Sequence, residues 1–143
     1  MSTLPAVLEP LPGDRLYAPA SEMWVQFDGD EIITGATHFA ASLGEFLIFT
    51  PKPIGRAIAR DRALGLMELG KTIVAIHAPL SCRIVASNTE VVANPLVTNQ
   101  DPYGAGWLFR LQPTRLAEER GFLLSAAAYR IWLYLYTPPP ADE

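Results

Sequence analysis

Cysteine is almost absent from this chain, since Cys82 is the single one among 143 residues. One cysteine excludes an internal disulfide bond and any CxxC redox or zinc motif. The two histidines, His38 and His77, add too few ligands to indicate a zinc site. Any redox chemistry is therefore expected to come from a cofactor or to use this one thiol. An enzyme with a catalytic pair of Cys82 and a histidine is the alternative.

Long apolar runs and clusters of positive charge are absent as well. No run approaches the roughly 20 apolar residues of a membrane-spanning helix. No stretch rich in lysine and arginine indicates nucleic-acid binding, and the N-terminus lacks the basic and apolar regions of a signal peptide. We therefore expect a cytoplasmic protein with neither a membrane nor a nucleic-acid partner.

Short β-prone runs separated by turn residues fill most of the chain, which predicts a mainly β fold of antiparallel strands. Asp28-Gly29-Asp30 lies between two such runs and is a hairpin signal. Strands are expected over residues 24–27, 31–35, 45–50, 56–61, 63–68, 72–78, 82–86 and 106–112.

Helices are expected mainly near the C-terminus. Thr37 is predicted to N-cap a short helix over 37–43, and residues 94–106 are expected to form a loop. Further helices are predicted over 113–120, capped by Thr114 and ended by Gly121, and over 125–136, capped by Ser125 and ended by Pro138–Pro140. The expected domains are an irregular arm (1–16), a carrier β domain (17–112) and a C-terminal helical appendage packed on it (113–143).

Lysine is scarce, and one of the two lysines, Lys71, lies between two apolar, β-prone runs. Gly70 directly before it predicts a hairpin turn with the lysine at its tip. An exposed amine at such a tip is what a covalent carrier protein needs. An ordinary solvated lysine in a turn is the alternative on the local sequence alone.

Several separated motifs accompany this lysine in a fixed order. They are Tyr17, Gly35-x-Thr37-x-x-Ala40, Leu43-Gly44-Glu45, Gly55, Glu68-Leu-Gly-Lys71, Pro79, Asn94-Pro95, Pro102-Tyr103-x-x-Gly106-Trp107 and Leu124-Ser-Ala-Ala-Ala-Tyr129. In order and spacing the chain resembles the H protein of the glycine cleavage system, a lipoyl-carrier family with the hammerhead, or barrel-sandwich, β fold. The resemblance covers about residues 17–129 and has no gap between Leu43 and Pro79.

The resemblance implies a non-catalytic carrier with lipoic acid in amide linkage to Lys71. Glu68 and Gly70 match the positions by which the hairpin would be recognised. The implied partners are a lipoate-protein ligase and dihydrolipoyl dehydrogenase. Amide formation removes the lysine charge, and the dithiol/disulfide couple of the lipoyl ring can carry electrons or a sulfur-bound group.

Two departures from the family pattern bear on the pathway. Met23 and Ala75 stand where the family places carboxylates that hold the amine of its aminomethyl cargo. Glu22 is one residue away, and a displacement of one residue turns a strand side chain to the other face. An ammonium group taken into a cleft without polar partners loses much of its hydration energy.

Because these carboxylates are missing, the chain resembles more the divergent lipoate-binding proteins of bacterial sulfur oxidation. These serve a heterodisulfide-reductase-like complex, in which the arm would carry sulfur. A glycine cleavage H protein carrying the aminomethyl group is the alternative. An unlipoylated relative, or a role in moving lipoyl groups between proteins, is also left open.

Overall fold

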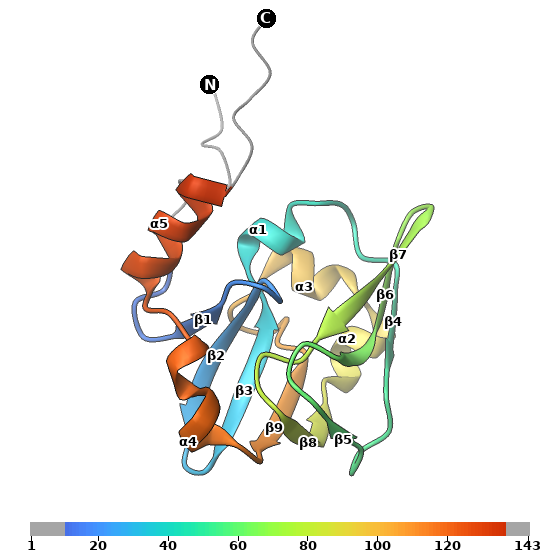
Figure 1. Cartoon of the computed structure of the whole chain (residues 1–143). Helices are drawn as coiled ribbons and strands as arrows, with labels where there is room; N and C mark the ends of the chain where they lie inside the picture. Colours follow the sequence, from blue (N-terminus) through green and yellow to red (C-terminus); the bar gives the residue numbers. More distant parts are fainter. Residues whose placement is uncertain (1–10, 137–143) are drawn as a thin grey trace, which may run out of the picture.

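The computed structural model describes residues 11–136, which form two antiparallel sheets with short helices around them (Figure 1). The larger sheet has the strand order β1-β2-β3-β9-β8-β5. In that order its strands are β1 (Leu16–Ala18), β2 (Met23–Asp28), β3 (Glu31–Ala36), β9 (Phe109–Pro113), β8 (Cys82–Ser87) and β5 (Ala57–Ile58). All of its pairings are antiparallel, as the sequence predicts.

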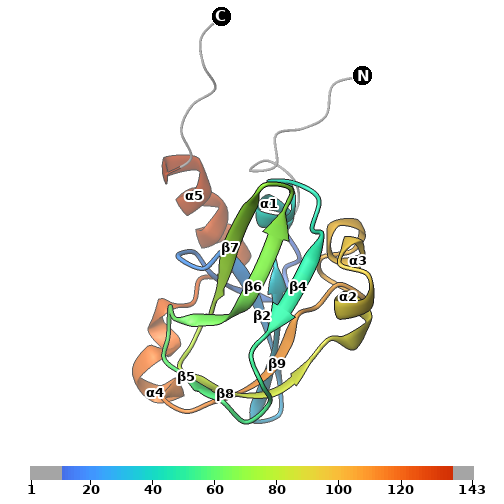
Figure 2. The ribbon, with the colours of Figure 1, turned by 90° about the vertical axis from the view of Figure 1, so that its right-hand side faces the viewer.

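The smaller sheet has three strands in the order β4-β6-β7. They are β4 (Ile48–Pro51), β6 (Ala63–Leu69) and β7 (Thr72–His77). Figure 2 shows this sheet from its outer side, with β6 between the two edge strands. Strands β6 and β7 form the hairpin in which the sequence places Lys71.

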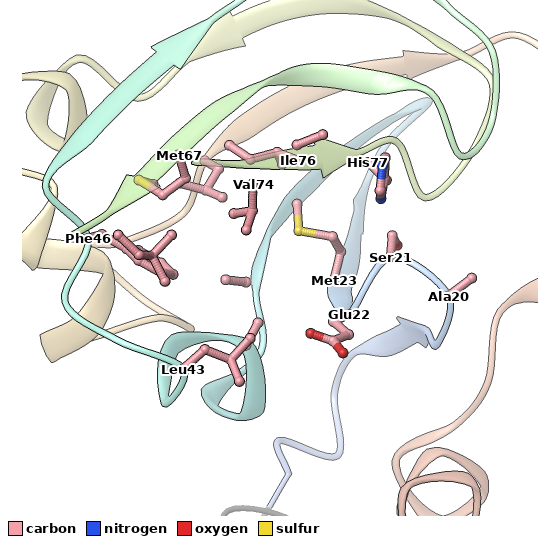
Figure 3. Close-up of a pocket in the computed structure, with 15 residues that line it drawn as sticks. Ala20, Ser21, Glu22, Met23, Leu43, Phe46, Met67, Val74, Ile76 and His77 are labelled. Carbon is pink, nitrogen blue, oxygen red and sulfur yellow. The ribbon is translucent and has the colours of Figure 1, made fainter. Parts of the chain in front are cut away.

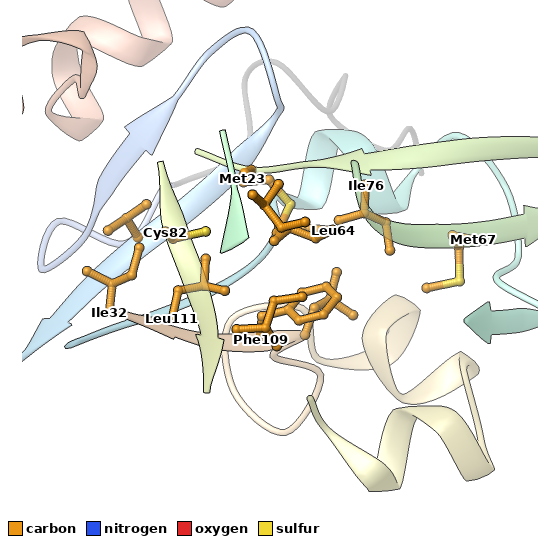
Figure 4. Close-up of a cluster of buried hydrophobic side chains, with 14 of the residues drawn as sticks. Met23, Ile32, Leu64, Met67, Ile76, Cys82, Phe109 and Leu111 are labelled. Carbon is orange, nitrogen blue, oxygen red and sulfur yellow. The ribbon is translucent and has the colours of Figure 1, made fainter. Parts of the chain in front are cut away.

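The main hydrophobic core lies between the two sheets (Figure 4). Alternate residues of each strand point inward, because successive side chains of a strand face opposite sides. Phe49 of the small sheet meets Phe109 of the large sheet edge to face, with ring centroids 5.5 Å apart. The fully buried members include Val25, Ile32, Leu64, Met67, Leu80, Ile84, Leu108 and Leu111.

A second buried cluster attaches α5 (Ala126–Tyr136) to the large sheet. The rings of Tyr17 on β1 and Tyr129 on α5 stack with centroids 5.0 Å apart, and Trp24 and Leu133 complete the cluster. The Oγ atom of Ser125 accepts a hydrogen bond from the Ala128 backbone N–H at 3.1 Å, which confirms the predicted cap.

The other helices are short. They are α1 (His38–Ala41), α2 (Thr89–Ala93), α3 (Leu96–Gln100), α4 (Leu116–Glu119) and the 3-10 turn η2 (Arg120–Phe122). Thr37 caps α1 by accepting a hydrogen bond from the Ala40 backbone N–H, as predicted.

The prediction of a loop over 94–106 is wrong, because α3 lies inside it and α2 directly precedes it. Helices of five residues carry little periodicity, and tertiary hydrogen bonds hold these two. The side-chain amide of Asn88 donates to the carbonyls of Ala105 and Trp107, and Thr98 Oγ1 donates to the Gly106 carbonyl.

Three other predicted boundaries are also wrong. The strand expected over 56–61 ends at Ile58, because a turn follows in which the Arg62 N–H donates to the Ala59 carbonyl and Asp61 has a left-handed φ of 67°. The strand expected from residue 106 begins at Phe109, after a turn in which Gly106 N–H donates to the Asp101 carbonyl. Thr114 caps no helix: its N–H donates to the Ser81 carbonyl, and α4 begins at Leu116.

The division into arm, carrier domain and appendage stays a prediction. Leu16 already pairs with Val25 in the large sheet, while Gly121, the expected helix end, lies inside η2. Residues 1–10 of the expected arm and the prolines at 138–140 fall outside the described residues. Between residues 11 and 136, no helix has both the length and the apolar character needed to cross a membrane.

Candidate functional site

Lys71 lies at the tip of the β6–β7 hairpin. Leu69 pairs with Thr72, so Gly70 and Lys71 form a two-residue turn. Gly70 has a φ of 60° whereas Lys71 does not have a positive φ, which is the pattern of a type II′ turn with glycine in its first central position. The lysine is exposed, and Figure 1 shows the tip projecting away from the rest of the molecule.

Glu68 belongs to the same hairpin. It lies in β6 between Ile48 of β4 and Ile73 of β7, and it is half-buried. The structure therefore places Glu68, Gly70 and Lys71 together at one end of the small sheet. Gly70 supplies the left-handed backbone of the turn; recognition of Glu68 by a partner stays a prediction.

A cavity of about 290 Å³ lies beside this hairpin, between β7 and the chain that leads into β2 (Figure 3). Most of its lining is apolar. The lining residues are Ala20, Ser21, Glu22, Met23, Ala36, Ala40, Leu43, Phe46, Met67, Leu69, Val74, Ala75, Ile76, His77 and Leu108. We call this space the cleft; Leu69 and Val74 bring it to within three residues of Lys71.

Met23 and Ala75, the positions at which the resemblance implies carboxylates, both line the cleft. Glu22 also lines it and is the one acidic side chain among its lining residues. The expectation that a shift of one residue turns Glu22 away from the cleft is therefore wrong.

The backbone of Glu22 explains why two successive residues reach the same space. Glu22 has a left-handed φ of 56°, so it lies in the turn before β2 and not in the pleated strand. Its N–H donates to the Pro19 carbonyl at 3.3 Å, and its carbonyl accepts from the Thr37 N–H at 3.1 Å. A left-handed φ is uncommon in residues other than glycine and costs conformational energy. These two hydrogen bonds therefore hold Glu22 in a strained conformation.

Burial raises the pKa of the Glu22 carboxyl above its usual range. A carboxylate in a mostly apolar cleft is short of water, and it gains most from a cationic partner. The cleft can therefore accept an apolar chain that ends in a positively charged group.

Side chains from distant segments fix the helix beside Glu22. The Tyr103 hydroxyl lies 2.7 Å from His38 Nδ1 and accepts from the His38 N–H at 3.0 Å. Thr37 both caps α1 and holds the Glu22 carbonyl.

Sequence reasoning did not single out Ser21 and His77 as cleft residues. Neither carries a local signal, because only the packing of β7 against the β1–β2 turn brings them together.

The histidines and the cysteine do not gather as metal ligands. Within residues 11–136 no group of three His, Cys, Asp or Glu side chains could hold a metal ion. Cys82 is absent from the cleft lining and belongs to the main core, where its exposed fraction is 1%. Burial, together with the charge of Glu119, raises the pKa of its thiol to about 12.

We expect Cys82 in the folded protein to resist alkylation. A thiol with this pKa has almost no thiolate near pH 8, and the thiolate is the nucleophile. Labelling by iodoacetamide, followed by intact mass, should be more than about a hundredfold slower in the native protein than in urea. Equal rates in the two conditions would contradict both the burial and the raised pKa.

The chain matches the glycine cleavage H-protein family over residues 15–134. The glycine cleavage system H protein of Acinetobacter baumannii is 34% identical over 116 residues, covering 80% of this chain and 93% of that protein. The H protein of Thermus thermophilus is 35% identical over 121 residues, covering 84% and 93%. This chain belongs to the glycine cleavage H-protein family.

A solved structure agrees with this assignment. The crystal structure of a glycine cleavage system H protein from Mycobacterium marinum aligns with a TM-score of 0.75 and 33% identity, covering 85% of this chain and 98% of that one. The predicted hammerhead β fold is confirmed. The protein is a non-catalytic carrier, and its family carries a lipoate attached covalently to a lysine.

Proposed function

We propose that this chain is a lipoyl carrier of the glycine cleavage system and that Lys71 bears the lipoyl group. The observation that supports this best is the position of Lys71 on an exposed hairpin tip beside a cleft that contains Glu22. The other lysine, Lys52, is half-buried directly after β4 and does not lie at the tip of a hairpin.

The described residues fit such a group. The cleft lining is mainly apolar, as an eight-carbon acyl chain requires, and it starts next to the lysine. When attached, the lipoyl group supplies a dithiol that carries the aminomethyl cargo between enzymes. The chain itself positions the arm, excludes water from the cleft and presents one carboxylate.

Glu22 has the central role among the cleft residues. Its carboxylate would accept hydrogen bonds from the ammonium group of the cargo, in place of the carboxylates that Met23 and Ala75 do not provide. A charge-assisted hydrogen bond of this kind is worth about 1.5–3 kcal/mol. The apolar lining around it strengthens the attraction, because charges interact more strongly beside apolar groups than in bulk water.

The sulfur-oxidation role expected from the sequence has no support in the comparisons, which favour the glycine cleavage alternative. A heterodisulfide-reductase-like partner is likewise unsupported. That expectation depended on a cleft without carboxylates, and Glu22 removes this premise. The partners we propose are glycine decarboxylase, aminomethyltransferase, dihydrolipoyl dehydrogenase and a lipoate-attaching enzyme.

Reconstitution tests the proposal. The lipoylated chain is mixed with purified glycine decarboxylase, and glycine-dependent release of CO₂ is measured against the unmodified chain and against the Thermus thermophilus H protein. We expect turnover that requires lipoylation. If the lipoylated chain gives no turnover with enzymes that accept the Thermus protein, the glycine cleavage role is wrong.

A further inference from the structure

An apolar strip lies on the outer face of the small sheet, on the side opposite the core. It consists of Ile48, Leu66 and Ile73, whose exposed fractions are 51%, 44% and 59%. Ile48 and Ile73 both pair with Glu68, and Leu66 precedes Glu68 by two residues, so these side chains share one face. We call these three residues the outer strip.

The outer strip is not part of the core. Phe49 and Met67, which alternate with its members along β4 and β6, are the buried residues of those strands, 3% and 2% exposed. Figure 2 shows the three strands facing the viewer with no other described element over them. Three large apolar side chains on one uncovered sheet face are typical of an interaction surface.

The charges around the small sheet are unevenly placed. Glu68 lies within the outer face, and the exposed Glu45 comes shortly before β4. Positive residues lie at the other end of the same sheet, where Lys52 directly follows β4 and the exposed Arg62 directly precedes β6. A partner that fits the end of this face beside Lys71 presents an apolar centre with positive charge toward Glu45 and Glu68.

The chemistry of Lys71 indicates which partner this is. Enzymes that act on the finished carrier can bind the lipoyl arm, but the enzyme that attaches the arm meets only the protein surface and a bare lysine. To select Lys71 over Lys52, it must contact the surface beside the hairpin tip. The outer strip is continuous with that tip, since Ile73 follows Lys71 by two residues in β7.

We propose that the outer strip is the docking surface for the ATP-dependent enzyme that attaches lipoate to Lys71, an inference that rests on the function proposed above. In the step it serves, the neutral lysine amine attacks the carbonyl carbon of a lipoyl adenylate. The C–N amide bond forms, the bond from that carbon to the phosphate oxygen breaks, and AMP leaves with the electron pair. One proton passes to solvent, and nothing is oxidised or reduced.

The test uses the unmodified full chain with purified lipoate-protein ligase, lipoate and ATP, and it follows lipoylation by intact mass. Leu66→Asp and Ile73→Asp should each lower kcat/KM about tenfold or more, mainly through KM, because a charge replaces an apolar contact and adds to the negative face. Leu66→Val and Ile73→Val should retain most of the rate.

Matched controls are Ile54→Asp and Leu135→Asp, which change exposed apolar residues outside the strip, 68% exposed in each case. Both should be lipoylated at the wild-type rate. Circular dichroism and the melting temperature of each variant show whether it folds. Should an aspartate variant fail to fold, a competition assay replaces it: Lys71→Arg protein, which cannot be acylated, should inhibit the ligase, and adding Leu66→Ser should weaken that inhibition about tenfold.

The outcomes separate this inference from the function on which it rests. If the wild-type chain is not modified at Lys71, the proposed function fails. If it is modified and the strip variants show wild-type kcat/KM, the docking surface is wrong. Normal lipoylation with lost glycine turnover, or a dimer that Leu66→Asp dissociates, would assign the strip to another partner and would also overturn the inference.

Discussion

Replacing Lys71 by arginine is expected to abolish lipoylation and carrier activity together while leaving the fold intact. Arginine keeps the positive charge, but its guanidinium group stays protonated and does not form the amide. The exposed tip makes few packing contacts, so the free energy of unfolding should change by no more than about 0.5 kcal/mol. Intact mass after incubation with ligase measures the modification, and release of CO₂ from glycine measures activity.

Lys52→Arg is the matched control, because it changes the only other lysine in the same way. It should be modified once, like the wild type, and should remain active. A lipoyl increment on Lys71→Arg protein, or its loss in Lys52→Arg protein, would show that the lysine assignment is incorrect.

Glu22→Gln is expected to reduce glycine turnover by roughly ten- to a hundredfold without reducing lipoylation. The amide has the shape of the carboxylate but carries no charge, so the cargo ammonium loses its one anionic partner in the cleft. Lipoylation should persist because the ligase acts before any cargo is present. The measurements are kcat/KM for glycine decarboxylation and, separately, the rate of lipoyl attachment.

Glu90→Gln provides the comparison for charge alone, since Glu90 is exposed on α2 and outside the cleft lining. This variant should keep wild-type turnover. Wild-type turnover in Glu22→Gln protein would instead mean that the cleft holds its cargo without this carboxylate.

Replacing Glu22 by glutamine should lower glycine turnover without lowering the free energy of unfolding. Its folded-state pKa is raised by burial, so between the unfolded and folded pKa values the native state binds more protons than the unfolded state. Its contribution to the free energy of unfolding therefore declines as pH rises through this interval and is lowest once the carboxylate is ionised in both states. At neutral pH Glu22→Gln should be at least as stable as the wild type. The measurement is the free energy of unfolding by denaturant at pH 5 and pH 7. A Glu22→Gln protein that is less stable than the wild type at pH 7 would show that its lost activity has a structural cause.

The sequence by itself determined the hairpin and its lysine. Gly70 before Lys71, with apolar runs on both sides, specifies a tight turn, because glycine alone adopts a left-handed φ there without strain. The short β-prone runs separated by turn residues likewise specified a mainly β fold, since both signals are local. The motifs that identify the family are local in the same way.

Only the tertiary structure decided the contents of the cleft. Glu22 reaches it through a strained backbone held by a turn hydrogen bond to Pro19 and by a hydrogen bond from Thr37, and no local pattern encodes the contact with Thr37. Helices α2 and α3 depend in the same way on Asn88 and Thr98, which bond to residues 8 to 19 positions away. Because Glu22 is one residue away from the expected position, the sequence suggested that the cleft has no carboxylate. In the folded chain Glu22 lines the cleft.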